Sequence, residues 1–334
     1  MADVNVHLAL CQRLLDADAK PVSLHPGHAG TRVLRASTAA HGDVIVKIHR
    51  GLERHHQEVH AYRTWVPALG DRAPQLLATT DDPPVIVITA VAGVPLAERQ
   101  LGPGAEQNAY RQAGHLLKTL HAAGPPRLEP DWTAWLAERA EYWIHQAGDR
   151  ITAARRAEVR AHMRALQELA PLPTLPCHLD FMPRNMIYGD DGTVRLIDFE
   201  HSRYDLPARD LVRLATRVWP HRPDLCASFL HTYGRLGAVD EAILEHCAHF
   251  DFLTSLARQA VPQHAADTLS PSEPANDTPT SDHREGRTQP LRALRRNGLH
   301  RRHEHGPAVG PGRSGPPLPG TGDCITFHKY DPGQ

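Results

Sequence analysis

One stretch of the chain restricts its fold more than any other: CHLDFMPRNMIYGDDGTVRLIDFE, residues 177–200. Its two short apolar runs are strand-like, and the DDG sequence between them is typical of the tight turn of a β-hairpin. Asp180, Asn185 and Asp198 interrupt these runs. A buried carboxylate without a partner is costly, so such residues usually titrate, form pairs or bind a metal. A simple hairpin explains the turn but not these three polar side chains.

A second informative position is Lys47, in the alternating, strand-like run DVIVKIHR at 43–50. The chain has 37 basic residues, and only four of them are lysines. A compact ammonium group and a planar guanidinium bind different partners, so a lysine kept within a strand of so arginine-rich a chain indicates a function. The alternative is an edge-strand lysine whose ammonium group is solvated.

The apolar periodicity along the chain predicts an α+β protein, with a β-rich first part and a helical remainder. Residues 1–91 are expected to form a small N-terminal lobe, an antiparallel sheet with one inserted helix. From about residue 104 the pattern is helical, so residues 92–261 are expected to form a larger, mainly helical C-terminal lobe. The elements predicted in the first lobe are a helix over 3–17, strands over 31–38, 43–50, 75–80 and 85–91, and a helix over 53–69.

The last part of the chain, residues 262–334, has a different composition. It is rich in Pro, Gly, Arg, Ser and His and has no apolar period. Such a composition cannot offset the entropy lost on ordering, which predicts a mostly disordered tail. Out-of-frame translation of GC-rich DNA would give a similar composition and is the alternative interpretation.

The overall charge and the cysteines indicate which partners and compartment to expect. The net charge is −1, so no global field attracts nucleic acid or a membrane surface. The first twenty residues predict neither a signal peptide nor a membrane span. Five scattered cysteines without a C-x-x-C pair are typical of free thiols in a reducing compartment. We therefore expect a cytoplasmic monomer or dimer that binds neither nucleic acid nor membrane.

The polar residues of 177–200 also follow a known pattern. HLDFMPRN matches H-x-D-x-x-x-x-N, and IDFE stands thirteen residues after Asn185, where protein kinases have D-F-G. Over roughly residues 20–260, the chain resembles the aminoglycoside phosphotransferase and choline kinase-like family. This resemblance implies a bilobal protein-kinase-like fold and an ATP- and Mg²⁺-dependent O-phosphotransferase. The P-loop pattern of the other large class of ATP-binding proteins does not occur in the sequence.

The resemblance also implies roles for the residues around the two motifs. Asp180 would be the catalytic base that accepts the proton of the acceptor hydroxyl. Asn185 and Asp198 would bind Mg²⁺ through oxygen ligands. His178 would brace the catalytic loop, and Asp210 would tie that loop to the following helix.

The nucleotide would lie between the lobes. Lys47 would contact the ATP phosphates and be held by Glu58, although Glu53 is nearby and a solvated helix carboxylate is common. The remaining ATP-binding residues that the resemblance implies are Gly27 and Gly30 in a GHAGT loop over the phosphates, and the hinge from Thr89 to Val91 beside adenine.

The segment between Asp198 and Asp210 is short and no A-P-E sequence follows it, which favours a small-molecule hydroxyl acceptor over a protein substrate. An aminoglycoside or another antibiotic is the predicted acceptor, with Glu200, Asp205 and Asp251 as candidate contacts. Choline, homoserine or a sugar is an alternative acceptor. A non-catalytic, nucleotide-binding pseudokinase is the alternative function.

Overall fold

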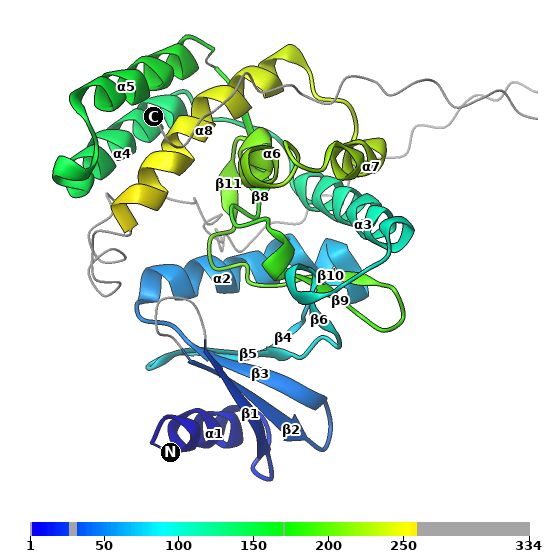
Figure 1. Ribbon diagram of the computed structural model, residues 1–334. Helices are drawn as coiled ribbons and strands as arrows, with labels where there is room; N and C mark the ends of the chain where they lie inside the picture. The colour runs from blue at the N-terminus through cyan, green and yellow to red at the C-terminus, as the bar shows by residue number, and fades with distance from the viewer. Residues whose placement is uncertain (1, 27–31, 170, 259–334) are drawn as a thin grey trace, which may run out of the picture. The chain divides into compact units, whose positions relative to one another are not determined.

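A five-stranded antiparallel sheet forms the first lobe of the computed structural model, which describes residues 2–26, 32–169 and 171–258 (Figure 1). The strand order is β1-β2-β3-β5-β4. The sequence predicts four of these strands but not β1, whose two prolines disfavour a strand. Proline is tolerated there because β1 is an edge strand, with one side free of a hydrogen-bonding partner in the sheet. The strands are β1 (Lys20–Pro26), β2 (Arg32–Thr38), β3 (Gly42–Ile48), β4 (Leu76–Asp81) and β5 (Pro84–Thr89).

Two helices cover the two faces of this sheet (Figure 1). Helix α1 (Ala2–Leu14) packs on one face, where Leu10 joins a core with Val44 and Val46 of β3. Helix α2 (Leu52–Thr64) lies on the other face, toward the second lobe. Because side chains alternate along a strand, Lys47 points to the face opposite Val46 and thus toward the second lobe.

The second lobe is mainly helical, with short strand pairs that carry the loops of the candidate site. Prolines at the first turns of α3 and α7 fit helix starts, where no amide donor is needed. Its helices are α3 (Pro103–His121), α4 (Trp132–Ala147), α5 (Ala153–Glu168), α6 (Val212–Arg217), α7 (Pro223–Tyr233) and α8 (Ala238–Arg258). Its strands are β6 (Val94–Pro95), β7 (Arg127–Leu128), β8 (Pro173–Cys177), β9 (Met186–Tyr188), β10 (Val194–Leu196) and β11 (Arg203–Asp205).

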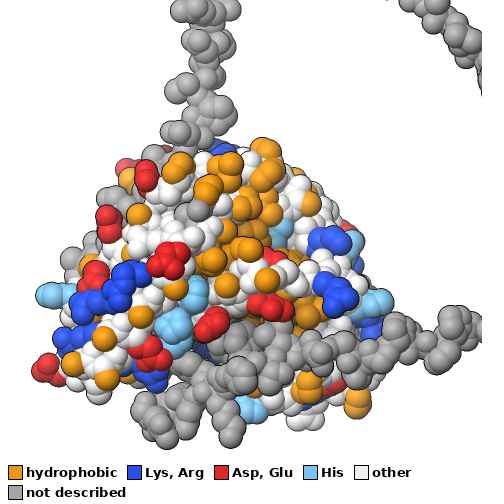
Figure 2. Space-filling model, turned by 90° about the horizontal axis from the view of Figure 1, so that it is seen from above, with side chains coloured by type: hydrophobic (Ala, Val, Ile, Leu, Met, Phe, Trp, Pro, Cys, Tyr) orange, Lys and Arg blue, Asp and Glu red, His pale blue; other side chains and the backbone are white. Residues whose placement is uncertain are grey.

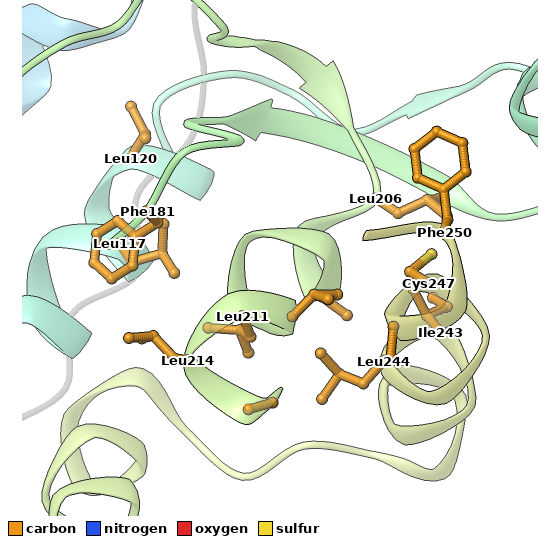
Figure 3. Packing of buried hydrophobic residues seen from close by; sticks show 14 of the residues in the cluster. Leu117, Leu120, Phe181, Leu206, Leu211, Leu214, Ile243, Leu244, Cys247 and Phe250 are labelled. Carbon is orange, nitrogen blue, oxygen red and sulfur yellow. The ribbon is translucent and has the colours of Figure 1, made fainter. Parts of the chain in front are cut away.

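The core of this lobe surrounds the segment that leads into α6. Leu211 and Leu214 lie between Leu117 of α3 and Leu244 of α8 (Figure 3). Phe181, which belongs to the HLDFMPRN motif, is only 1% exposed and packs in the same core. The loop that carries the motif is therefore anchored by apolar packing on its inner side.

Helices α5 and α8 contact each other through a group of histidines. The rings of His162 and His249 stack with their centres 3.6 Å apart, and Nδ1 of His162 lies 3.0 Å from Nδ1 of His246. Burial and the neighbouring His162 lower the pKa of His249 from 6.5 to about 4. The folded protein therefore holds His249 neutral at a pH where an unfolded chain would protonate it.

We expect the free energy of unfolding to fall as the pH is lowered from about 6.5 to about 4. Between these values the unfolded state binds the proton of His249 and the folded state does not, so acid favours unfolding. The full effect is on the order of 3 kcal/mol. Urea titrations across this range should show a smaller pH slope in His249→Asn than in His231→Asn, which changes an exposed histidine of α7. Equal slopes would contradict the prediction.

Within the described residues, no helix combines the length and the apolar character needed to cross a bilayer.

Candidate active site

The loop between β8 and β9 carries the HLDFMPRN motif and is fixed from behind by Asp210. This carboxylate is 2% exposed and accepts the backbone amide of His178 at 2.8 Å and that of Leu179. Nε2 of His121, at the end of α3, lies 2.9 Å from the same carboxylate. Burial opposes the charge, but these hydrogen bonds hold the pKa of Asp210 below its usual value. As a buried anion, Asp210 thus joins the catalytic loop to α3. The sequence motifs do not indicate His121, its partner on α3.

His178 connects this loop to the segment that carries Asp198. Its Nε2 lies 2.9 Å from the carbonyl oxygen of Ile197, and its Nδ1 lies 3.2 Å from the backbone amide nitrogen of Asp180. One neutral tautomer, with the proton on Nε2, satisfies both bonds. These contacts favour a bracing role over a reactive one.

Asn185 and Asp198 meet at the base of the hairpin formed by β9 and β10. The amide of Ile197 donates to the carbonyl of Asn185 at 3.0 Å, which brings the following residue, Asp198, alongside. The side-chain amide of Asn185 donates to Asp180 Oδ2 at 2.8 Å. The sequence-predicted base and both predicted metal ligands therefore lie close together.

Two residues of the site have an unusual backbone conformation. Leu179 and Asp198 have φ values of 61° and 67°, in the left-handed region where a residue with a Cβ is strained. Such strain persists only where the surrounding structure imposes it, and it is concentrated at functional sites. One of the two residues directly precedes Asp180, and the other is Asp198 itself.

Lys47 reaches from β3 across to the second lobe. Its Nζ lies 2.7 Å from Asp198, 3.0 Å from Glu58 and 2.8 Å from Glu200. Burial opposes the positive charge, but the three carboxylates outweigh it and hold the pKa of Lys47 well above its usual value. Three carboxylates around one ammonium leave an excess of negative charge.

The structure thus brings Lys47 together with Glu58, as the sequence suggests, whereas Glu53 is exposed at the start of α2. Glu200, predicted from the sequence as an acceptor contact, lies beside Lys47 in this group. His49, which belongs to neither motif, lies 2.6 Å from Glu58, and both side chains are 1% exposed. Its position two residues after Lys47 in a strand was the available signal, because such residues share a face.

Two arginines hold the carboxylate of Asp180. Nη2 of Arg184 lies 2.8 and 2.7 Å from its two oxygens, and Nη1 of Arg213 donates to Oδ1. Neither arginine was selected from the sequence. An acceptor hydroxyl would have to share or displace one of these donors to reach Asp180.

The acceptor contacts expected at Asp205 and Asp251 are not available in the predicted way. Asp205 is fully buried and accepts hydrogen bonds from Arg203 and Arg209. Asp251, on α8, is bound by Arg213 and Arg217. These carboxylates are neutralised within the protein and do not form an acidic pocket for a cationic acceptor. The sequence showed the acids but not the arginines that the fold places against them.

The remaining sequence-predicted nucleotide contacts are only partly described. Gly27 and Gly30 lie outside the described residues. Thr89 ends β5, and its amide donates to the carbonyl of Gln75 at 3.0 Å. The amide of Ala90 donates to the backbone carbonyl oxygen of Asp43. Val91 is the next residue of the predicted hinge, and its amide is therefore the candidate donor to adenine.

Comparison with known proteins gives one family and a set of solved structures. A family model described as "Phosphotransferase enzyme family" matches residues 22–247. No curated protein is a significant match to the sequence.

Solved structures resemble the fold at low sequence identity. A spectinomycin phosphotransferase in complex with ADP and spectinomycin matches with 16% identity, over 79% of this chain and 90% of its own, with a TM-score of 0.54. Choline kinase LicA from Streptococcus pneumoniae matches with 18% identity, over 78% and 92%, with a TM-score of 0.57. Macrolide 2′-phosphotransferase MphH from Brachybacterium faecium matches with 16% identity, over 80% and 94%, with a TM-score of 0.53. The predicted bilobal α+β fold is therefore confirmed.

Proposed function

Because the chain belongs to the phosphotransferase enzyme family, we propose that it transfers the γ-phosphate of ATP to a hydroxyl group of a small molecule. The family and the phosphotransferase class predicted from the sequence are both confirmed by the family match. The observation that carries the proposal is the meeting of Lys47, Glu58 and Asp198 beside the linked pair of Asp180 and Asn185.

The proposed metal is Mg²⁺, held by Asn185 and Asp198. An amide and a carboxylate supply the hard oxygen ligands that Mg²⁺ prefers. The excess of carboxylates around Lys47 fits a site that takes up further positive charge. When bound, Mg²⁺ would neutralise negative charge on the phosphates.

The protein side chains have distinct parts in the proposed transfer. Lys47, held by Glu58, binds the phosphates of ATP and orients them. Asp180 accepts the proton of the acceptor hydroxyl as the oxygen forms its bond to the γ-phosphorus. The bond from that phosphorus to the bridging oxygen breaks, and ADP leaves with the electron pair.

A small-molecule acceptor is supported by the segment between Asp198 and Asp210. Within it, β11 (Arg203–Asp205) pairs with β8, and a 3₁₀ turn (Pro207–Leu211) follows directly. This segment is packed against the lobe and offers no extended loop on which a polypeptide could dock. An aminoglycoside or other antibiotic remains the sequence-based prediction for the acceptor.

Mass spectrometry of an acceptor panel incubated with ATP, Mg²⁺ and the protein tests this function. The panel should include aminoglycosides, spectinomycin, macrolides, choline, homoserine and sugars. We expect one class to gain a single phosphoryl group, with an equal amount of ADP, and chelation of Mg²⁺ to abolish both. Nucleotide binding without product from any acceptor would instead indicate a pseudokinase.

A further inference from the structure

Helices α5 and α8 pack against each other at the top of Figure 1, and each contributes possible metal ligands to the contact. His162 of α5 lies with Glu245 and His246 of α8. One ligand atom from each of these three residues lies within 4.8 Å of the other two. Imidazole nitrogens and carboxylate oxygens are common ligands of transition-metal ions. None of the three residues belongs to the proposed phosphotransfer site.

The two histidines are already spaced as ligands of one ion. Nδ1 of His162 lies 3.0 Å from Nδ1 of His246, and the two ring planes are inclined at 50°. Zn²⁺ binds histidine nitrogens at about 2.0–2.1 Å in tetrahedral geometry, which places two of its ligands roughly 3.4 Å apart. An ion that replaces the proton between the two nitrogens therefore needs only a small separation of the rings.

Glu245 can complete the ligand set because its side chain is exposed. Rotation about the bonds of a glutamate side chain can bring its carboxylate onto the ion without any change in the helix. The carboxylate also balances part of the charge of a divalent cation. Two imidazoles and one carboxylate leave the fourth tetrahedral position to water.

A further histidine fixes the ring of His162. The ring of His249 stacks on it with the centres 3.6 Å apart and the planes 14° apart. A ring nitrogen binds a metal in the plane of its ring, so two stacked rings cannot both direct a nitrogen at one ion. His249 therefore packs against the ligand His162 and limits its rotation. Contacts of this kind orient the ligands of metal sites.

The site is open to solvent. His162 and His246 are partly exposed, and Glu245 is exposed. Figure 2 looks onto the face that is uppermost in Figure 1 and shows histidine side chains next to acidic ones on it. A metal ion can therefore enter from solution without unfolding either helix.

We propose that His162, Glu245 and His246 form a binding site for a transition-metal ion of the Zn²⁺ class, which joins α5 to α8. The two histidines are 84 residues apart in the chain, so one ion cross-links distant segments. Mg²⁺ is not expected at this site, because it prefers oxygen ligands. The inference is independent of the proposed phosphotransfer, since an ion that links two helices needs neither nucleotide nor acceptor.

Thermal unfolding of the full chain with and without Zn²⁺ tests the site, with Mg²⁺ in every sample. An ion that binds only the folded state raises Tm. At 100 times its Kd, the rise for a chain of this size should be roughly 5–10 °C, and EDTA should reverse it. An unchanged or lowered Tm would overturn the proposal. The chelated protein is the form to which the pH dependence expected from His249 applies.

Substitutions locate the ion. Zn²⁺ should raise the Tm of His231→Gln, at an exposed position of α7, as it does in the unmodified protein, but not that of His162→Gln or His246→Gln. Glu245→Gln should weaken Zn²⁺ binding at least 10-fold on the order-of-magnitude scale of metal-site substitutions. Because Glu245 is exposed, this variant keeps the test valid even if a histidine variant does not fold. Glu241→Gln, at an exposed position one turn earlier in α8, is its matched control and should bind normally.

An equal rise in Tm in all these variants would place the ion elsewhere and overturn the proposal. The chain has 24 histidines, so bound Zn²⁺ alone does not identify the site. Hydrogen exchange supplies the location. Zn²⁺ should slow amide exchange in α5 and α8 of the unmodified protein but not of His246→Gln. Slower exchange confined to other segments would contradict the link between the two helices.

Discussion

Asp180→Asn is expected to lower kcat for phosphoryl transfer by roughly 10²- to 10⁴-fold, the usual contribution of a positioned general base. An asparagine keeps the shape of the side chain and can still accept from Arg184, but it cannot take the proton of the acceptor hydroxyl. ADP and phosphorylated acceptor should decline together in a discontinuous assay. Nucleotide affinity, measured by calorimetry, should change little because Lys47 and Asp198 are untouched.

Asp190→Asn makes the same chemical change at an exposed position of the neighbouring hairpin. Asp190 pairs with Arg99, and its side chain is 91% exposed. Full activity in this variant would show that the loss at Asp180 is local. Comparable activity of Asp180→Asn and the unmodified protein would remove Asp180 as the base.

Asp210→Asn is expected to destabilise the protein by about 3 kcal/mol, because it removes hydrogen bonds to a buried carboxylate and leaves a buried donor without a partner. The carboxylate of Asp210 accepts hydrogen bonds from two backbone amides of the catalytic loop and contacts His121. These contacts use both carboxylate oxygens, whereas an asparagine side chain has only one oxygen that can accept. Urea unfolding followed by circular dichroism measures the change. Activity should fall as well, because the loop that carries Asp180 loses its anchor.

The pH dependence of this variant gives an independent check. The folded-state pKa of Asp210 is lowered, so its contribution is complete above the unfolded pKa of about 3.9 and is lost as pH falls through the lower folded value. Asp210→Asn should therefore be less sensitive to acid in that range. Asp224→Asn, in a half-exposed pair with Arg222, should cost less than about 1 kcal/mol. Equal costs for the two variants would contradict a special role for Asp210.

The sequence predicted the part of the site that depends on local spacing. The hairpin of β9 and β10, with the residues just before and after it, contains Asp180, Asn185 and Asp198. The alternating pattern of a strand is enough to place Lys47 on one face of the sheet. Strand β1 was missed because its prolines are tolerated only at a sheet edge, and an edge cannot be recognised from a short segment alone.

The partners of the buried charges could not be predicted in the same way. Arg213 binds Asp180 from 33 residues away, and His121 binds Asp210 from 89 residues away. Such pairs depend on how α3 and α6 pack, and a sequence rich in arginine offers many equivalent candidates for each acid. For the same reason the sequence shows Asp205 and Asp251 but not the arginines that bind them.

Helix α2 and the residue after it are attached to the segment that follows Asp198. Trp65, directly after α2, donates from Nε1 to the hydroxyl of Ser202 at 2.8 Å, and Tyr62 packs edge-on against Phe199. In protein kinases the corresponding helix is a movable part, and activation depends on bringing it into place. Here that helix is joined to the segment that follows Asp198. Catalysis would then need no prior switching event, and its timing would follow the supply of acceptor.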